Sequence, residues 1–317
     1  MEKGFPAPLF RDPIFDGASD PTVIWNKKEA CYYMFYTQRR STSVQVGFSS
    51  IHGSKIGVAT STDKKGWLYR GTLKNLDIEH GHNTFWAPEI LEANGTYHMY
   101  VSYITGIPTT WEYPRHILHY TSENLWDWTY QSTLQLSSER VIDACVYEVC
   151  PGVYKMWYKD ENHDSHIYAA QSTDLYQWEV VGEEISDCSQ EGPNVFELGG
   201  KKWMICDCWK GLSVYVSDDF TNWKHCPGNL LVEPGKDPSD QTNGHHADIL
   251  VENGEAEIYY FTGQYPEDCA DVGLRALTAV QGCRLYAEDQ LGKLLAKKVL
   301  AHETDGALKE LSDMLNI

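Results

Sequence analysis

Three acidic residues and a histidine pair stand at equivalent points of a recurring pattern in this 317-residue sequence. They are Asp20, Asp143, Glu191 and the pair His245–His246, and each lies close to the start of a short apolar run. Carboxyl and imidazole groups that meet in one pocket can divide the work of general acid and general base between them. A single carboxylate at the start of a strand is usually a turn residue, whereas three at equivalent points of different repeats indicate a common site.

The composition favours an uncharged, sugar-like ligand over an anionic one. The chain carries 45 Asp and Glu residues against 26 Lys and Arg, which gives a formal net charge of −19, and 13% of its residues are aromatic. A polyphosphate would be repelled by this field, so the sequence argues against nucleic-acid binding. Sugars suit such a surface, because their C–H faces stack on aromatic rings while their hydroxyls bond to carboxylates.

The sequence also argues against a membrane protein. It contains no apolar run of the roughly 18 residues that a membrane span requires, and its first residues lack the long apolar stretch of a signal peptide. The nine cysteines show no zinc-binding spacing, and we interpret most of them as buried thiols of a reducing compartment. We therefore expect a cytoplasmic protein that binds neither membranes nor nucleic acids.

Short runs of alternating hydrophobicity predict strands along almost the whole chain. Cys31–Thr37 and Thr96–Ser102 are two such runs, both rich in Tyr, and most turns carry Asn-Gly or Gly-Gly steps that favour hairpins. Helical periodicity appears only near the end, in the leucines of ALKELSDML, and predicts a helix or tail over residues 302–317. We therefore expect an all-β protein with a short C-terminal helix.

The strands recur as a larger unit, whose copies open near residues 20, 86, 143, 191 and 245. Five units of roughly 50 residues, each with about four strands, describe a single five-bladed β-propeller domain over residues 1–317. Two stacked sandwich domains are the competing architecture, but no linker divides the chain. The first strand of each blade lines the axis of a propeller, so the unit openings are expected to converge on one funnel.

The ordered unit openings resemble those of glycoside hydrolase family 43 and its five-bladed propeller relatives. The segments that carry the resemblance are, in chain order, Ala18–Ile24, Trp86–Ile90, Val141–Ala144, Glu191–Pro193 and Gly244–His246. The resemblance implies an inverting, exo-acting glycosidase for oligosaccharides of plant-type polysaccharides, of the α-L-arabinofuranosidase or β-xylosidase kind. It implies no required cofactor.

The resemblance assigns the three carboxyl groups to catalytic roles. Asp20 is expected to be the general base and Glu191 the general acid, while Asp143 raises the pKa of Glu191 and orients it. Inversion needs the base and the acid roughly 6.5–9.5 Å apart, which leaves room for a water molecule.

The resemblance implies binding roles for four further residues. Trp86 is expected to form a wall of the sugar subsite, His246 to contact the sugar, and Arg284 to reach the site from the last blade. His245 matches an axial histidine that in some members helps to hold Ca²⁺ through waters, so it is the candidate ligand of a structural Ca²⁺ on the axis.

Some departures from the family pattern leave other interpretations open. The fifth unit reads Tyr259–Thr262 where many members carry a Tyr-His pair. In related propeller families a histidine is a candidate acid, so His245 or His246 could take the role of Glu191. A non-catalytic sugar-binding propeller is a second alternative, although such a binder is expected to have lost a carboxylate. A third is a transferase or fructan-type hydrolase with Asp20 as nucleophile, which needs carboxyl groups only about 5–5.5 Å apart.

Overall fold

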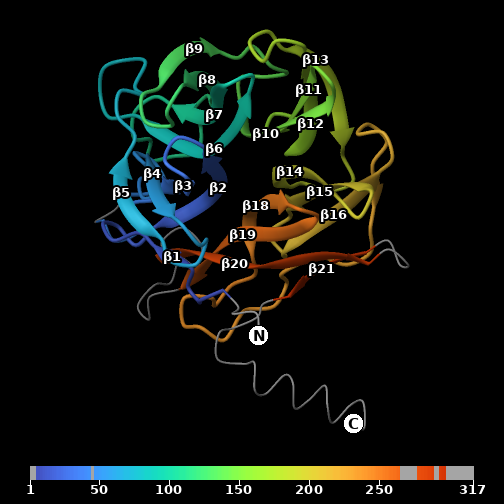
Figure 1. Ribbon diagram of the computed structural model, residues 1–317. Helices are drawn as coiled ribbons and strands as arrows, with labels where there is room; N and C mark the ends of the chain where they lie inside the picture. Colours follow the sequence, from blue (N-terminus) through green and yellow to red (C-terminus); the bar gives the residue numbers. More distant parts are fainter. Residues whose placement is uncertain (1–4, 44–45, 265–276, 289–292, 298–317) are drawn as a thin grey trace.

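The sequence repeats fold into five antiparallel sheets, which stand around a central axis as the blades of a propeller (Figure 1). The structure is a computed structural model and describes residues 5–43, 46–264, 277–288 and 293–297. It confirms the all-β, five-bladed prediction, while the predicted helix over 302–317 lies outside the described residues. Within the described part of the chain, no helix has the length and apolarity that crossing a membrane demands.

Each blade begins with the strand nearest the axis and adds its next strands outward in chain order. Blades 1 and 2 consist of β2 (Ala18–Asn26), β3 (Cys31–Gln38), β4 (Lys55–Ser61) and β5 (Leu68–Thr72), then β6 (Thr84–Ala93), β7 (Thr96–Ile104), β8 (His116–Ser122) and β9 (Thr129–Thr133). Blades 3 and 4 consist of β10 (Val141–Cys150), β11 (Val153–Asp160), β12 (His166–Ser172) and β13 (Glu179–Ile185), then β14 (Glu191–Leu198), β15 (Lys201–Asp207), β16 (Leu212–Ser217) and β17 (Lys224–His225).

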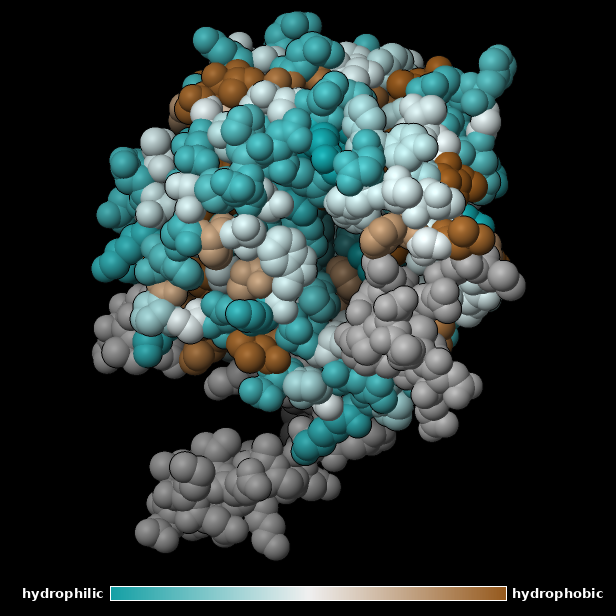
Figure 2. All heavy atoms as spheres, turned by 180° about the vertical axis from the view of Figure 1, so that it is seen from behind, coloured by the Kyte–Doolittle hydropathy of each residue, from teal (hydrophilic) through white to brown (hydrophobic). Residues whose placement is uncertain are grey.

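Both ends of the described chain contribute to blade 5, and this closes the ring. The blade contains β18 (His245–Glu252), β19 (Glu255–Gln264), β20 (Leu277–Glu288) and β21 (Lys293–Lys297), together with β1 (Phe10–Arg11). The N-terminal β1 pairs with β20, with Phe10 opposite Val280, beside the last blade (Figure 1). The closed ring leaves a hollow near the centre of the face that Figure 2 shows.

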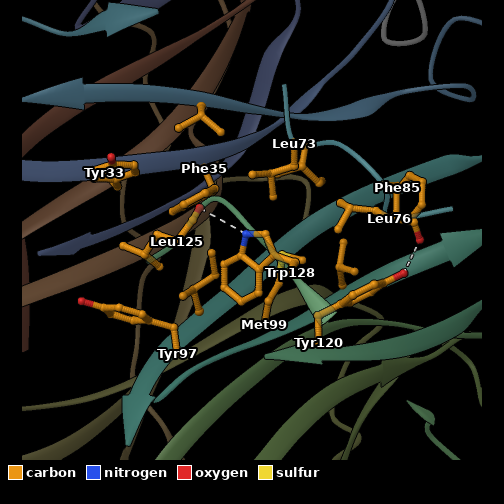
Figure 3. Close-up of a cluster of buried hydrophobic side chains, with 14 of the residues drawn as sticks. Tyr33, Phe35, Leu73, Leu76, Phe85, Tyr97, Met99, Tyr120, Leu125 and Trp128 are labelled. Atoms are coloured by element: carbon orange, nitrogen blue, oxygen red, sulfur yellow. Dashed lines mark hydrogen bonds between the residues drawn. The ribbon is translucent and has the colours of Figure 1, made fainter. Parts of the chain in front are cut away.

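Apolar side chains fill the spaces between neighbouring blades. The cluster between blades 1 and 2 is drawn in Figure 3, where Phe35 of β3 and Met99 of β7 are fully buried on either side of the interface. The Trp128 indole N–H donates to the carbonyl of Leu125 in the same cluster. Because comparable clusters lie at the other four interfaces, the inner strands are held at fixed positions around the axis.

A β-bulge recurs at the same point of all five inner strands. The pairing register with the second strand shifts there, after Ser19, Trp86, Ile142, Glu191 and His245. The residue that follows each of these has a positive φ angle: 48° at Asp20, 46° at Ala87, 61° at Asp143, 53° at Gly192 and 26° at His246. Such conformations are costly for residues other than glycine and concentrate beside functional sites, where bulges redirect side chains.

Candidate active site

The bulges surround a pocket at one end of the axis. Residues from all five inner strands line it, and two loops complete it; the lining residues are Asp20, Arg39, Ile51, Trp86, Trp111, Ile142, Asp143, Glu191 and His246. Five of the predicted site residues therefore meet in one place, namely Asp20, Trp86, Asp143, Glu191 and His246. The convergence expected from the unit openings is what the fold produces.

Asp20 presents a carboxylate with few hydrogen-bond donors to this pocket. The Ser19 hydroxyl donates to Asp20 Oδ2 over 3.1 Å. Two cationic side chains approach Oδ1 without close contact: Arg39 Nη2 lies 3.9 Å away and His246 Nδ1 3.7 Å away. The Arg39 guanidinium is itself held over the ring of Phe261, 4.8 Å from its centroid. With a single hydroxyl donor and no close cation among the described residues, the Asp20 carboxylate keeps oxygen lone pairs that can accept a hydrogen bond from a water molecule, which is what a general base needs.

Glu191 is ion-paired in the free protein. Lys159 Nζ lies 2.8 Å from Glu191 Oε2, and the Trp209 indole N–H donates to Oε1 over 3.1 Å. Burial alone would raise the pKa of Glu191, but Lys159 and these hydrogen bonds outweigh it, and the pKa is lowered. A buried ammonium group thus touches the same carboxylate that Asp143 is expected to keep protonated, and it acts against that effect in the free protein.

The surroundings of Asp143 and His246 shift their pKa values in the opposite direction to that of Glu191. Burial first, and then the charge of Glu191, raise the pKa of Asp143. Burial opposes the charged form of His246, but the surrounding carboxylates of Asp143, Asp20 and Glu191 outweigh it and raise the pKa of His246. His246 Nδ1 lies 3.8 Å from Asp143 Oδ2, so the carboxylates share a histidine placed among them.

The glycine of the Glu-Gly-Pro segment makes room for that histidine. A Cβ atom on Gly192 would come within 2.8 Å of the His246 ring, and Gly192 has a φ angle of +53°. Its N–H also donates to Asp143 Oδ2 over 3.2 Å. Glycine is thus required both by the backbone conformation and by the close approach of His246, and this position ties blade 4 to blades 3 and 5.

Aromatic rings form one side of the pocket. Trp86 stacks on Trp111 with ring centroids 5.9 Å apart and an interplanar angle of 20°. The Trp86 indole N–H donates to the carbonyl of Ile51, and His52 packs against the same ring. A flat apolar wall beside carboxylates suits a sugar ring. The position of Trp86 agrees with its predicted role, whereas Trp111, in the loop between β7 and β8, was not anticipated.

His245 turns away from its predicted environment. Its Nδ1 lies 2.9 Å from Asp207 Oδ2, and its ring stacks on Phe261. Asp207 also accepts the backbone N–H of His246, so it fixes the whole pair. Among the described residues, no three His, Cys, Asp or Glu side chains are grouped so as to hold a metal ion. The described side chains around His245 therefore do not form a site that binds Ca²⁺ directly.

Arg284 does not reach the pocket, and its predicted role in sugar binding is wrong. Arg284 on β20 pairs with Glu257 on β19. The pocket end of β19 is marked by Phe261, which pairs with His245 and lies four residues further along the strand. The Arg284 guanidinium pairs with Glu255, at the hairpin between β18 and β19. The antiparallel register thus carries Arg284 toward the other end of the blade, and the arginine beside the pocket is Arg39.

Lys159 and Trp209, which both contact Glu191, were also missed by the sequence reasoning. Lys159 belongs to β11 and is almost buried, with a side chain 5% exposed. A lysine directly after the aromatic run Tyr154–Tyr158, inside a predicted strand, was a usable signal, because a buried ammonium group needs acidic partners. Trp209 lies in the turn between β15 and β16, and nothing in its sequence context distinguishes it from other exposed aromatics.

A five-bladed propeller with three carboxyl groups and an aromatic wall at one end of its axis has the machinery of a propeller glycosidase. The model of the glycosyl hydrolases family 43 matches residues 10–278, and the chain belongs to this family. It is a glycoside hydrolase, as the resemblance of the unit openings implied. No curated protein sequence gives a significant match.

Solved structures of other family members share the fold. A thermostable family-43 glycoside hydrolase is 20% identical with a TM-score of 0.70, over 92% of this chain and 97% of that chain. An exo-1,5-α-L-arabinanase from a bovine ruminal metagenomic library is 16% identical with a TM-score of 0.63, over 89% and 96%. A β-xylosidase/α-arabinofuranosidase from a compost microbial metagenome, in a calcium-free complex with xylotriose, is 12% identical with a TM-score of 0.65, over 95% and 98%.

Proposed function

We propose that this glycoside hydrolase is an inverting, exo-acting enzyme that releases single sugars from plant-type oligosaccharides, as an α-L-arabinofuranosidase or β-xylosidase. The observation that carries the proposal is the grouping of Asp20, Asp143 and Glu191 beside Trp86 in one end pocket. The activities of two structural neighbours, an exo-arabinanase and a β-xylosidase/α-arabinofuranosidase, support the choice of sugars.

In the proposed reaction a water molecule attacks the anomeric carbon from the face opposite the leaving oxygen. Asp20 accepts a proton from this water as the new C–O bond forms. Glu191 gives a proton to the leaving oxygen as the glycosidic bond breaks, so proton uptake and release balance. Asp143, hydrogen-bonded to the N–H of Gly192, is the positioning group beside the acid.

A histidine acid is the alternative that a specific observation favours. Both oxygens of Glu191 accept hydrogen bonds from nitrogen donors, whereas the pKa of His246 is raised toward the range of a useful acid. His246 is, however, enclosed by Asp20, Asp143 and Gly192. We retain Glu191 as the acid, because it lies at the rim where Trp209 is exposed to solvent.

Three further predictions concern a bound metal ion, the location of the protein and its binding partners. An axial Ca²⁺ near His245 stays a prediction, supported only by the description of one neighbour as a calcium-free form. A cytoplasmic location stays a prediction as well, as does the lack of membrane and nucleic-acid partners.

Two measurements test the proposed function. A panel of nitrophenyl glycosides should show hydrolysis of the arabinofuranoside or xyloside and little of the galactosides. Proton NMR of the first product formed should show the inverted anomer. A retained anomer would make Asp20 a nucleophile, and hydrolysis of galactosides alone would contradict the sugar class.

A further inference from the structure

Trp209 combines three features that its position in a turn does not explain. Trp209 is 44% exposed, and its indole N–H donates to the partly buried carboxylate of Glu191. Its backbone has a φ angle of 58°, an uncommon conformation for a bulky residue. Its backbone N–H donates to Asp207 Oδ1 over 2.8 Å, and the other oxygen of Asp207 holds His245. The main chain of Trp209 is thus anchored, while its side chain extends to the edge of the pocket.

The two donors of Glu191 differ in how readily they can leave. Lys159 is almost buried and also contacts Glu161, whose other oxygen lies 2.9 Å from Arg115, so it is fixed within a buried ionic network. Trp209 is exposed and has no such network. Glu191 can donate a proton only if one of its oxygens carries that proton. Oε1 is the oxygen that can take it up, because its hydrogen bond from Trp209 can be broken more readily than the bond from Lys159 to Oε2.

The two faces of the Trp209 ring are also unequal. Lys159 Nζ lies over the ring, 5.4 Å from its centroid, so a cation occupies one face. A sugar that approaches from solvent can contact the other face, with its C–H groups against the ring. A sugar there would lie on the leaving-group side of the bond, because Trp209 adjoins the acid rather than Asp20.

We propose that Trp209 is both the binding platform of the leaving-group sugar and a latch on the acid. The inference rests on the proposed function. When the leaving-group sugar stacks on the indole, the Trp209 N–H withdraws from Glu191 Oε1. Having lost this donor, the carboxylate takes up a proton from solvent at Oε1 and delivers it to the leaving oxygen. Trp209 is a positioning residue, which couples acid protonation to the presence of a sugar.

Charged groups from three other blades face Glu191 and set its protonation together with Trp209. They are Lys159 of β11, Asp143 of β10, Asp20 of β2, and His245 and His246 of β18. Replacing Trp209 alters none of these charges. A shift in the pH profile of a Trp209 variant can therefore be assigned to the lost N–H.

The test uses two variants of Trp209 and two substrates. The substrates are the xylose or arabinose disaccharide that the enzyme cleaves and the corresponding glycosyl fluoride, whose leaving group offers no ring to stack. Trp209→Ala should lower kcat/KM on the disaccharide about tenfold, from the lost ring contact, and should barely change it on the fluoride. Trp209→Phe keeps a ring, so it should retain much of the disaccharide activity. Its alkaline pH limb should move up by about one unit, because a lost donor to the carboxylate raises the pKa of the acid.

Trp25→Ala is the matched control, since Trp25 is also an exposed tryptophan, 37% accessible and packed on Tyr32. It should leave both substrates and the pH profile unchanged. Equal losses of Trp209→Ala on both substrates would overturn the platform, and an unmoved alkaline limb in Trp209→Phe would overturn the latch.

A binding measurement separates this inference from the proposed function. In an Asp20→Asn background, which halts turnover, calorimetric titration compares the disaccharide with the monosaccharide. Adding Trp209→Ala should weaken disaccharide binding roughly three- to tenfold and leave monosaccharide binding unchanged. If the wild type cleaves no glycoside, the proposed function fails. If it cleaves glycosides but adding Trp209→Ala changes the affinity for the disaccharide and for the monosaccharide by the same factor, only the present inference fails.

Discussion

The two ends of the propeller axis carry the same kinds of residue for different purposes. The first residues of the inner strands line the catalytic pocket. Residues further along the same strands line a second hollow, which contains the partly buried Glu89 and Asp248. Burial raises the pKa of Glu89 to about 8 and that of Asp248 to about 6. A carboxyl group with a raised pKa is therefore found at both ends, and does not by itself mark the active site.

The partners of these carboxyl groups distinguish the two ends. In the second hollow, Glu89 accepts the backbone N–H of Val146, and Asp248 accepts that of Val23. Each bond joins one blade to another, so these groups fix the ring. In the pocket, the donors to Glu191 are the side chains of Lys159 and Trp209, one of which is exposed. Glu191, which is bound by side chains, can change partner and protonation during a reaction, whereas Glu89 and Asp248, each tied to a main-chain amide of the next blade, help to hold the ring.

Exchanging one carboxyl group at each end should separate these roles most strongly. Asp20→Asn removes the base but not the shape, so turnover should fall roughly 10²–10⁴-fold with little change in stability. Asp248→Ala leaves the Val23 N–H without its acceptor, so it should lower the free energy of unfolding by about 1–3 kcal/mol and leave turnover nearly intact. Steady-state kinetics and urea unfolding on both variants give the answer. Near wild-type turnover in Asp20→Asn would remove Asp20 from the mechanism.

Gly192→Ala should lower both turnover and the free energy of unfolding, because Gly192 contacts the catalytic groups and also joins neighbouring blades. The added Cβ strains a residue at a φ angle of +53° and displaces His246 from among the carboxylates. We expect a loss of about 1–2 kcal/mol in the free energy of unfolding and at least a tenfold loss in kcat. Gly95→Ala is the control, because Gly95 also has a positive φ angle but meets nothing within 4 Å. A wild-type kcat in Gly192→Ala would contradict the tight placement of His246.

The smallest effect concerns the pH dependence of stability at the second hollow. Glu89 has a raised pKa in the folded chain, so between its ordinary value and about pH 8 the folded state binds more protons than the unfolded state. The contribution of Glu89 to the free energy of unfolding therefore falls as pH rises through this window. Glu89→Gln keeps an acceptor but cannot ionise, so the decline in stability between about pH 5 and about pH 8 should be shallower than in the wild type. Urea unfolding at both pH values measures it, and an unchanged decline would contradict the assignment.

The residues that the sequence could place are those fixed by the repeat. Asp20, Asp143 and His246 stand at the same bulge of three blades, so aligning the unit openings was enough to bring them together. Glu191 and Trp86 stand one position earlier, directly before the bulge of their own blades, and the same alignment of unit openings found them. This information is local to one strand, and the closed ring of blades then brings the five strand starts together around the axis.

What the sequence could not supply depends on register and on contacts between blades. Lys159 meets Glu191 because β11 and β14 belong to neighbouring blades, and no spacing along the chain encodes that distance. Arg284 was misplaced because its motif shows which strand it occupies but not how far along the strand it lies. The low pKa of Glu191 follows from the same contact with Lys159, so its protonation state was out of reach as well.

The central claim is that Glu191, although ion-paired in the free protein, donates the proton to the leaving group. Glu191→Ala should be tested on a natural oligosaccharide and on a dinitrophenyl glycoside, whose leaving group needs little protonation. We expect a severe loss on the oligosaccharide and a much smaller loss on the activated substrate, because only proton donation has been removed. Equal losses on both substrates in Glu191→Ala, with the leaving-group dependence appearing instead in His246→Ala, would contradict it and make His246 the acid.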